Sequence, residues 1–239
     1  GARCADGGEG VGIVGDVIHT AQKISAMSET PAKLYKYRSL AGIGATWVED
    51  IVVRNTVYFA SAMSFNDPFD LKPSFSLRAP ADCQREDYLR MSRKFEPYLT
   101  EAQRLAEVER VMATAMSAEN IEETVATIQF VHNQFLTTSV GVFCVSTKRD
   151  DILMWSHYAD SHRGVCLEFD GLAPLMAHAQ AVEYSEDRVP INAYEDNDDV
   201  AMRKALLTKS THWAYEAEWR LISYAKGPGL TKFRPNNLT

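Results

Sequence analysis

The chain has 239 residues, of which 46% are hydrophobic and 24% charged, a composition typical of a soluble globular protein. Its 25 basic and 32 acidic residues give a net charge of −7, which disfavours a protein that chiefly grips nucleic acid. No apolar run approaches the roughly 18 residues of a membrane span, and no secretory leader is visible. The cysteines form no CxxC pair, so we expect reduced thiols in a cytoplasmic protein.

Strands are predicted on both sides of the middle of the chain, where β-branched and aromatic residues gather or alternate with polar ones. The clearest candidates are residues 56–60 (TVYFA), 142–147 (VFCVST) and 165–169 (VCLEF). We also expect strands at 33–37 (KLYKY), 219–224 (WRLISY) and 181–184.

Helices are predicted between these strands. A charged helix near residues 86–98 precedes a helical hairpin built from 100–115 and 121–135, and Thr100 and Gln103 have the spacing of a capping box. Shorter helices are expected at 150–158 and 198–212. The acidic segment 186–199 is expected to be a solvated loop, with a cation-binding or partner-facing role as the alternative.

This order of elements predicts a single α+β domain over residues 1–239, with a mixed or antiparallel sheet and a helical insertion at about 86–136. Residues 1–26 look displaced, because Met27-Ser-Glu-Thr-Pro resembles a natural start. We therefore expect a circular permutation, in which residues 27–239 are the body and residues 1–26 a permuted C-terminal segment. Whether such an order is natural or engineered stays open.

Two local patterns resemble a dinucleotide site and a metal site, but we expect neither site. Gly10-Val-Gly-Ile-Val-Gly15 spells GxGxxG, but no convincing strand precedes it, so we expect a lead-in to a helix rather than a dinucleotide site. His157 and His162 have no third ligand spaced nearby, so no metal is expected, and His157 is more simply a residue that packs or lines a pocket.

The segment 64–70 (SFNDPFD) is a candidate pocket wall. Asn66 and Asp67 stand before a proline, which favours a rigid turn, because Asx side chains bond to nearby backbone groups. The functional alternative places Asn66, Asp67 or Asp70 against a ligand or a cation.

Charged residues at two strand ends are the other candidates. If a strand begins near Tyr215, then Glu216, Glu218 and Arg220 share one face, as two carboxylates suited to stabilising a developing cation and orienting a nucleophile. Arg38 ends the first predicted strand, where an arginine can clamp a phosphate group. A surface ion pair and a surface arginine remain the structural alternatives.

Four motifs in order resemble a bacterial family known as domain of unknown function 2971. They are LYKYR at 34–38, VYFASAMSFNDPFD at 57–70, ILMWSHYADSHRGVCLEFD at 152–170 and WAYEAEWRLI at 213–222. The resemblance covers most of residues 33–237. In that family a strand and a closing helix follow the segment that ends here at Thr239, which agrees with a permuted order.

A second likeness concerns a possible activity. Arg38 on a first strand, Ser146 and Thr147 on a middle strand and Glu216-Ala-Glu218 on a late strand are similar to the R-S-E class of ADP-ribosyltransferases. The class usually has Ser-Thr-Ser, whereas Lys148 stands third here, and the helical insertion is long.

That resemblance implies an ADP-ribosyltransferase-like fold and a site for NAD as substrate. Glu218 would stabilise the positive charge on the ribose, Glu216 would orient or deprotonate the acceptor, and Ser146 with Thr147 would brace the site. Arg38 would clamp the pyrophosphate. An aromatic side chain would stack on the nicotinamide, the candidates being Tyr58, Trp155 and Tyr158.

Three other functions remain open at this stage. A binding module would hold a nucleotide or small anion without chemistry, in a pocket lined by Arg38, Asn66, His157 and Glu218. A toxin-like or defence-system interaction protein would dock a macromolecule through its acidic loop and helical hairpin. A nuclease is disfavoured by the negative charge. We expect a nucleotide-type ligand, no membrane partner, and an acceptor that can be a macromolecule.

Overall fold

The computed structural model describes residues 29–67, 69–78, 80–115, 118–188, 190–224 and 226–239. In this part of the chain the main sheet has seven strands, and every pairing in it is antiparallel. The strands are β1 (Lys33–Arg38), β2 (Thr56–Ser61), β4 (Gly141–Ser146), β5 (Val165–Asp170), β6 (Gln180–Ala181), β10 (Glu218–Ser223) and β11 (Gly229–Lys232). Two short parallel pairs join β3 (Phe75–Ser76) to β8 (Ile191–Asn192) and β7 (Glu183–Ser185) to β9 (Thr208–Ser210).

Helices fill the long connections between these strands. The described helices are α2 (Ile43–Val52), α3 (Ala81–Phe95), α4 (Glu101–Ala115), α5 (Ala118–Ser139), α6 (Ile152–Tyr158) and α7 (Asp198–Leu206). Three of them, α3 to α5, lie between β3 and β4 and form the predicted insertion. The fold is therefore α+β, with an antiparallel sheet and a helical insertion, as the order of predicted elements indicated.

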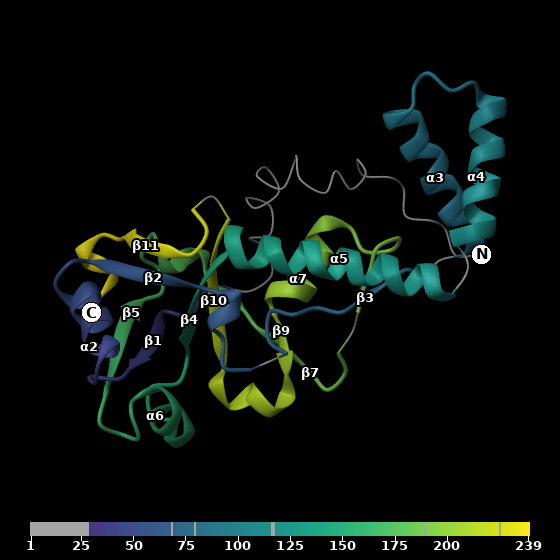
Figure 1. Ribbon diagram of the computed structural model, residues 1–239. Helices are drawn as coiled ribbons and strands as arrows, with labels where there is room; N and C mark the ends of the chain where they lie inside the picture. The colour runs from purple at the N-terminus through teal and green to yellow at the C-terminus, as the bar shows by residue number, and fades with distance from the viewer. Residues whose placement is uncertain (1–28, 68, 79, 116–117, 189, 225) are drawn as a thin grey trace.

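The sheet divides at β4 into two branches (Figure 1). On one edge, β10 pairs with β4 over its whole length, from Ser223 opposite Gly141 to Glu218 opposite Ser146. On the other edge, β2 pairs only with Gly141 and Val142, whereas β1 pairs with Ser146. Each branch then continues outward, β2 to β11 and β1 to β5. The middle of β4 thus has no strand partner on that edge among the described residues.

Alternate residues of β4 pack into two separate cores, because successive side chains of a strand point to opposite faces. Phe143 and Val145 join one apolar cluster, to which β1, β2, β5 and β10 contribute Leu34, Val57, Phe59, Phe169, Trp219 and Leu221. Val142 and Cys144 face a second cluster with residues of α5 and α7, among them Leu136 and Leu206. Both faces of β4 are buried, which makes it the central strand of the molecule.

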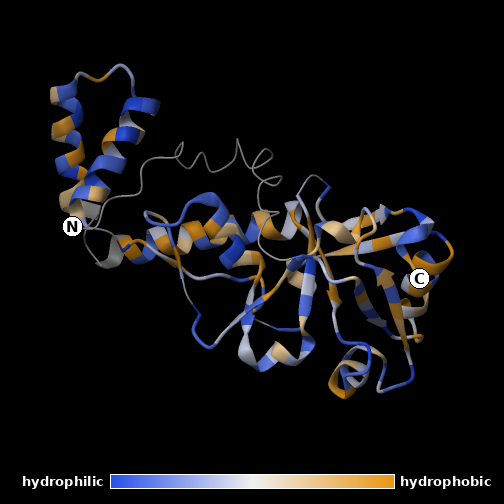
Figure 2. Cartoon of the chain, turned by 180° about the vertical axis from the view of Figure 1, so that it is seen from behind, coloured by the Kyte–Doolittle hydropathy of each residue, from blue (hydrophilic) through white to orange (hydrophobic). Residues whose placement is uncertain are grey.

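Helices α3 and α4 of the insertion form an arm that stands away from the sheet (Figure 2). Its helices α3 and α4 pack on each other through a small apolar cluster of Leu89, Val108 and Met112. Two ion pairs also join them, Arg85 with Glu109 and Arg93 with Glu101. The predicted hairpin of residues 100–115 with 121–135 is therefore wrong in its pairing: α4 pairs with α3, while α5 leads back to the sheet and contributes Leu136 to a body core.

Other local expectations can be compared with the structure. The capping box is confirmed: the Gln103 Oε1 accepts from the Thr100 amide at 3.0 Å, and the Thr100 hydroxyl accepts from the Gln103 amide at 3.3 Å. The strand expected at 181–184 is two strands in different sheets, β6 and β7. The helix expected at 198–212 ends at Leu206, after which β9 and a short 3-10 helix (Thr211–Glu216) follow.

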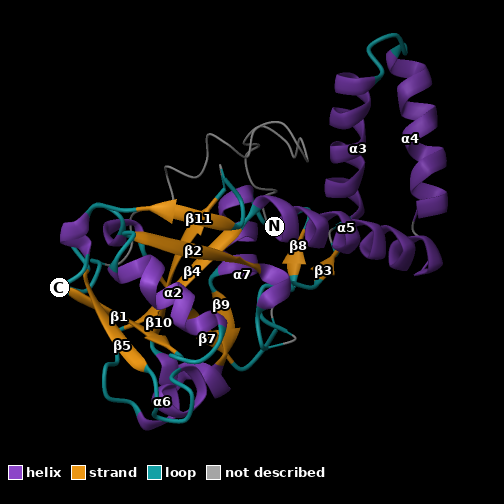
Figure 3. Ribbon diagram, turned by 60° about the vertical axis from the view of Figure 1, so that its left-hand side comes forward, coloured by secondary structure: helices purple, strands orange, loops and turns teal. Residues whose placement is uncertain are grey.

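The sequence patterns missed helix α2 and strands β3, β8, β9 and β11, and these strands have only two to four residues each. The permuted segment 1–26 and the GxGxxG pattern lie outside the described residues. The helices are drawn in purple in Figure 3. No helix in the described ranges has both the length and the apolar content to cross a bilayer. Cys144 and Cys166 are free thiols as expected, but Cys83 takes part in a disulfide bond, so the expectation of four reduced thiols is wrong there.

Candidate functional site

A cavity of about 660 Å³ opens where the two branches of the sheet part from β4. Its floor is the middle of β4, residues 142–146, and its walls come from β1 on one side and β2 on the other. Helix α2, the loop around Asn66, helix α6 and the start of β10 complete the lining. The missing strand pairing along β4 therefore creates the cavity, because no neighbouring strand fills the space beside residues 143–145.

Most of the candidate residues from the sequence line this cavity. Eight do so: Arg38, Tyr58, Asn66, Ser146, His157, Tyr158, Glu216 and Glu218. Three do not, namely Asp67, Thr147 and Trp155. Tyr58, Asn66 and His157 are exposed at the rim, whereas Ser146, Glu216 and Glu218 are buried. The structure thus brings together residues from six helices and strands and one loop.

The three strands named by the R-S-E likeness are neighbours. Arg38 ends β1, Ser146 ends β4 and Glu218 begins β10, and β4 lies between the other two strands. Ser146 stands directly opposite Glu218 in the register. Its hydroxyl donates to the Glu216 carbonyl oxygen at 2.5 Å and accepts from the Lys148 amide at 2.9 Å. Ser146 therefore fixes the backbone that carries Glu216, rather than either carboxylate directly.

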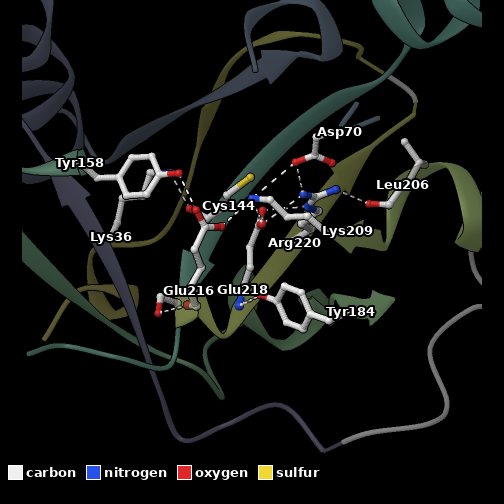
Figure 4. A network of polar contacts seen from close by, with 11 residues as sticks. Lys36, Asp70, Cys144, Tyr158, Tyr184, Leu206, Lys209, Glu216, Glu218 and Arg220 are labelled. Carbon is white, nitrogen blue, oxygen red and sulfur yellow. Dashed lines mark hydrogen bonds and ion pairs between the residues drawn. The ribbon is translucent and has the colours of Figure 1, made fainter. Parts of the chain in front are cut away.

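The two glutamates belong to a buried cluster of charges (Figure 4). Lys209 Nζ lies 2.5 Å from Glu216 Oε2, 2.9 Å from Glu218 Oε2 and 3.6 Å from Asp70 Oδ2. Arg220 is fully buried and donates from Nε to Glu218 Oε1 at 2.8 Å and from Nη2 to Asp70 Oδ2 at 2.7 Å. Three carboxylates thus share two cations, which offsets the large cost of burying each charge alone.

The carboxylates of this cluster are paired with the ammonium group of Lys209 and the guanidinium group of Arg220. Among the described residues, no group of three His, Cys, Asp or Glu side chains is arranged to hold a metal. The carboxylates of Asp70, Glu216 and Glu218 instead converge on Lys209. The chemistry of this cluster is therefore that of ion pairs and protons.

The shared face of Glu216, Glu218 and Arg220 arises differently from the expectation. Glu218 and Arg220 do alternate along β10, so their side chains meet. Glu216, however, ends the 3-10 helix, and Ala217 between the glutamates has a left-handed backbone with φ 41°. The expected strand start at Tyr215 is thus wrong. The turn at Ala217 nevertheless brings Glu216 back to the same lysine as Glu218.

The surroundings of the two glutamates push their pKa values in opposite directions. Burial opposes ionisation of Glu218, but Arg220 and Lys209 together outweigh it and hold the pKa of Glu218 well below its usual range. For Glu216, burial prevails over the attraction of Lys209, so its pKa is raised. Two carboxylates held apart in this way suit a fixed negative charge and a group that exchanges protons.

Helix α6 supplies a tyrosine to Glu216. The helix begins after Asp151, whose carboxylate accepts from the amides of Leu153 and Met154 at 2.9 and 3.1 Å. Tyr158 at its other end donates its hydroxyl to Glu216 Oε1 at 2.5 Å. Trp155 instead packs edge-on against Tyr37, with ring centroids 5.3 Å apart, so its position is structural.

The residues of the loop around Asn66 have two different positions. Asn66 lies at the rim of the cavity, whereas Asp67 and Asp70 make structural contacts. The Asp67 carboxylate accepts from the Phe69 amide at 2.8 Å, which is the local Asx bond expected of a rigid turn. That turn directs Asp70 into the charge cluster, where it accepts from Arg220. Asn66 lines the cavity, as Tyr158 does.

The wall opposite the carboxylates is cationic and aromatic. Arg38 lies 5.0 Å from the ring of Trp47, which stacks on Tyr58 with centroids 6.1 Å apart. Lys36, two residues before Arg38, also lines the cavity and donates to the Cys144 carbonyl oxygen at 2.5 Å. Helix α2 approaches closely enough to place Trp47 because of Gly44, whose added Cβ would lie 2.5 Å from the Ser39 carbonyl oxygen.

The sequence patterns did not single out Lys36, Trp47 or Lys209. Lys36 could have been found, because residues two apart on a strand share a face and Arg38 was already a candidate. Trp47 lies on helix α2, which the patterns missed. Lys209 lies in β9, where a helix was expected, and its partners are set by the tertiary fold.

Comparison with known proteins gives one match. A family model described as "Protein of unknown function (DUF2971)" matches residues 154–221, so the chain is similar to that family over the stretch from α6 to β10. The matched stretch includes Tyr158, Lys209, Glu216 and Glu218, whereas Arg38 lies outside it. No curated protein and no solved structure matches the chain.

Proposed function

We propose that the cavity binds a nicotinamide dinucleotide as substrate and breaks the bond between nicotinamide and ribose, passing ADP-ribose to an acceptor or to water. The observation that carries this proposal is the meeting of Arg38, Ser146 and Glu218 on three adjacent strands around one cavity. The order of these residues along the chain is the R-S-E order, and their spatial proximity was not required by that order.

The charge distribution of the cavity supports this reaction. When nicotinamide leaves with the electron pair of the broken carbon–nitrogen bond, positive charge develops on the ribose. Glu218, which Arg220 keeps ionised, supplies a negative charge at the floor. The raised pKa of Glu216 suits it to accept the proton of the attacking hydroxyl, amine or water. Glu218 would thus provide the fixed negative charge, and Glu216 would accept the proton.

The opposite wall suits the rest of a dinucleotide. Arg38 presents a guanidinium to the cavity, and a guanidinium can bind a phosphate oxygen pair in a bidentate manner. Trp47 and Tyr58 offer aromatic faces beside it. A volume of about 660 Å³ lies within the range of cavities that hold small organic ligands, roughly 300–1,000 Å³.

The saturation of Glu218 favours a second candidate, a nucleotide-binding protein without catalysis. Its two carboxylate oxygens already accept from Arg220 at 2.8 and 3.1 Å and from Lys209 at 2.9 Å. A carboxylate bound in this way also serves to brace the floor of a binding site. The two candidates share the ligand and differ only in whether the glycosidic bond breaks.

Release of nicotinamide from NAD by the purified protein, followed by mass spectrometry, separates them. We expect release by the wild type and at least about a 100-fold loss in Glu218→Gln, because a positioned charge in a buried site contributes on that scale. Tyr158→Phe removes only the hydroxyl that donates to Glu216, and we expect a smaller loss, about tenfold.

A matched control is Glu183→Gln, which changes an exposed glutamate that pairs with Arg203 outside the cavity. Its release rate should equal that of the wild type. Circular dichroism shows whether each variant is folded. If folded Glu218→Gln releases nicotinamide at the wild-type rate, the catalytic proposal is wrong. Binding of NAD without release by any form identifies the second candidate.

A further inference from the structure

Two cations of β1 face the cavity without a counterion. Lys36 and Arg38 are two residues apart on one strand, and both line the cavity. Lys36 Nζ donates to the Cys144 carbonyl oxygen, an uncharged acceptor, and Arg38 Nε is buried without a hydrogen-bond partner. Neither forms an ion pair within the described part of the chain, whereas Lys209, which also lines the cavity, and the buried Arg220 are paired with carboxylates.

The Cys144 carbonyl that Lys36 contacts belongs to the unpaired edge of β4. A strand carbonyl at that position would ordinarily accept from a neighbouring strand, but β1 and β2 have parted there. Lys36 satisfies this carbonyl and leaves further ammonium protons for another acceptor, because an ammonium group has three donors. Its position on the β1 wall, in contact with the floor strand β4, is therefore fixed by the fold.

Charged and titratable groups from three elements surround Lys36. Arg38 lies on its own strand, the Cys144 thiol on β4, Glu218 on β10, and Glu216 just before β10. Burial and the charge of Arg38 lower the pKa of Lys36 to about 7, against the opposing effects of the thiol and the carboxylates. Burial also lowers the pKa of Arg38, to about 10. The β1 wall of the cavity therefore carries two basic groups without a negative partner among the described residues. An anionic ligand could supply the missing negative charge.

We propose that Lys36 and Arg38 together form a subsite for a phosphoanhydride group, in which both side chains are charged when the anion is bound. Arg38 offers a planar fork and Lys36 a point charge, a combination that matches the oxygens of two linked phosphates. Trp47, packed under Arg38, holds the guanidinium on the cavity side. The carboxylates of Glu216 and Glu218 repel an anion, so the phosphates lie against β1.

The choice of ligand rests on the proposed function, but the subsite does not require cleavage. Proton uptake follows from linkage: an anion beside Lys36 favours its charged form and raises its pKa in the complex. Below about pH 7 the free protein already carries the proton, and binding takes up little. Above that pH, part of the binding energy protonates Lys36, so affinity falls as the pH rises.

The test is calorimetric titration with ADP-ribose, whose two pyrophosphate charges stay fixed around neutral pH. Titrations in two buffers of different ionisation enthalpy give the number of protons bound with the ligand. We expect a number near zero at about pH 6 that rises towards about one at about pH 8. No proton uptake at the higher pH, or no binding of ADP-ribose to the wild type, overturns the proposal.

Lys36→Met keeps an unbranched chain and removes the charge. We expect it to weaken ADP-ribose binding about 10- to 100-fold near pH 6, the scale of a charge-assisted hydrogen bond, and to abolish the proton uptake. Lys33→Met is the matched control, since Lys33 lies on the same strand but outside the cavity and pairs with Glu168 at 2.6 Å. Equal affinities of wild type and folded Lys36→Met contradict the subsite.

A third variant, Lys36→Arg, retains a charge that does not titrate in this range. It should bind ADP-ribose with an affinity independent of pH between about 6 and 8 and without proton uptake. An affinity that still falls with pH as in the wild type assigns the proton to another group and overturns the role of Lys36. These outcomes are separate from catalysis, because nicotinamide release is not measured.

Discussion

Lys209 holds three buried carboxylates in one place. Its ammonium contacts Glu216 and Glu218 directly and lies 3.6 Å from Asp70. Burial alone would lower the pKa of Lys209, but the two glutamates outweigh that effect and raise it. Without this cation, Arg220 would remain as partner of Asp70 and Glu218, and Glu216 would keep only the hydrogen bond from Tyr158.

Lys209→Met should therefore destabilise the protein strongly. We expect a loss of roughly 3–5 kcal/mol in the free energy of unfolding, because removing one partner of a buried pair leaves uncompensated charge. Urea denaturation measures the change. Adding Glu216→Gln to Lys209→Met should recover part of the loss, since it removes one unpaired carboxylate.

Lys33→Met again provides the comparison. The side chain of Lys33 is 59% exposed, and exposed ion pairs contribute at most about 1 kcal/mol. Equal and small effects of Lys33→Met and Lys209→Met would show that the buried cluster does not depend on Lys209.

Among the elements, β10 shows what the sequence pattern could and could not predict. Its alternation placed Glu218 and Arg220 on one face and Trp219 and Leu221 on the other, and the two cores confirm it. The turn before it was not predictable, because Ala217 adopts a left-handed backbone that non-glycine residues rarely take. The contact of Glu216 with Lys209 depends on that turn.

In other parts of the chain, too, features made by neighbouring residues were predictable, whereas features made by distant residues were not. The capping box at Thr100 and the Asx turn at Asp67 were predictable, because each is made by residues within a few positions of each other. The division of the sheet at β4 was not, since it depends on pairings between distant strands. The cavity that this division opens could therefore be seen only in the structure.

Ala217→Gly tests the strain in the turn before β10. With φ at 41°, alanine sits in a region that costs an L-residue roughly 1–2 kcal/mol, whereas glycine enters it freely. We expect the free energy of unfolding to rise by up to about 1 kcal/mol. Ala45→Gly, in the exposed part of helix α2, should instead lower it by about 1 kcal/mol. A loss of stability in Ala217→Gly would contradict the strain.

For the whole molecule, the division between body and arm predicts unequal local stability. The body has two apolar cores that meet at β4, whereas α3 and α4 share a small cluster of Leu89, Val108 and Met112. Segments with few buried apolar contacts open at lower free energy than segments in a large core. The amides of α3 and α4 should therefore exchange with deuterium earlier than those of β4.

Val108→Ala should increase the difference in amide exchange rate between the arm and β4, which hydrogen exchange with mass spectrometry measures. It removes apolar contacts from the arm, so exchange in α3 and α4 should become faster while β4 stays protected. Val145→Ala in the body core should speed exchange in β4 itself. If Val108→Ala accelerates β4 and the arm equally, the two parts unfold as one unit.

The division of the sheet also leaves a strand edge inside the molecule. Backbone groups on an open edge are a template for pairing with another extended chain, and charged side chains placed across such an edge prevent it. Lys36 lies across this edge and bonds to the Cys144 carbonyl. The Lys36 side chain thus prevents another extended chain from pairing with this edge of β4. A small apolar residue at position 36 would leave the edge exposed at the mouth of the cavity and favour aggregation.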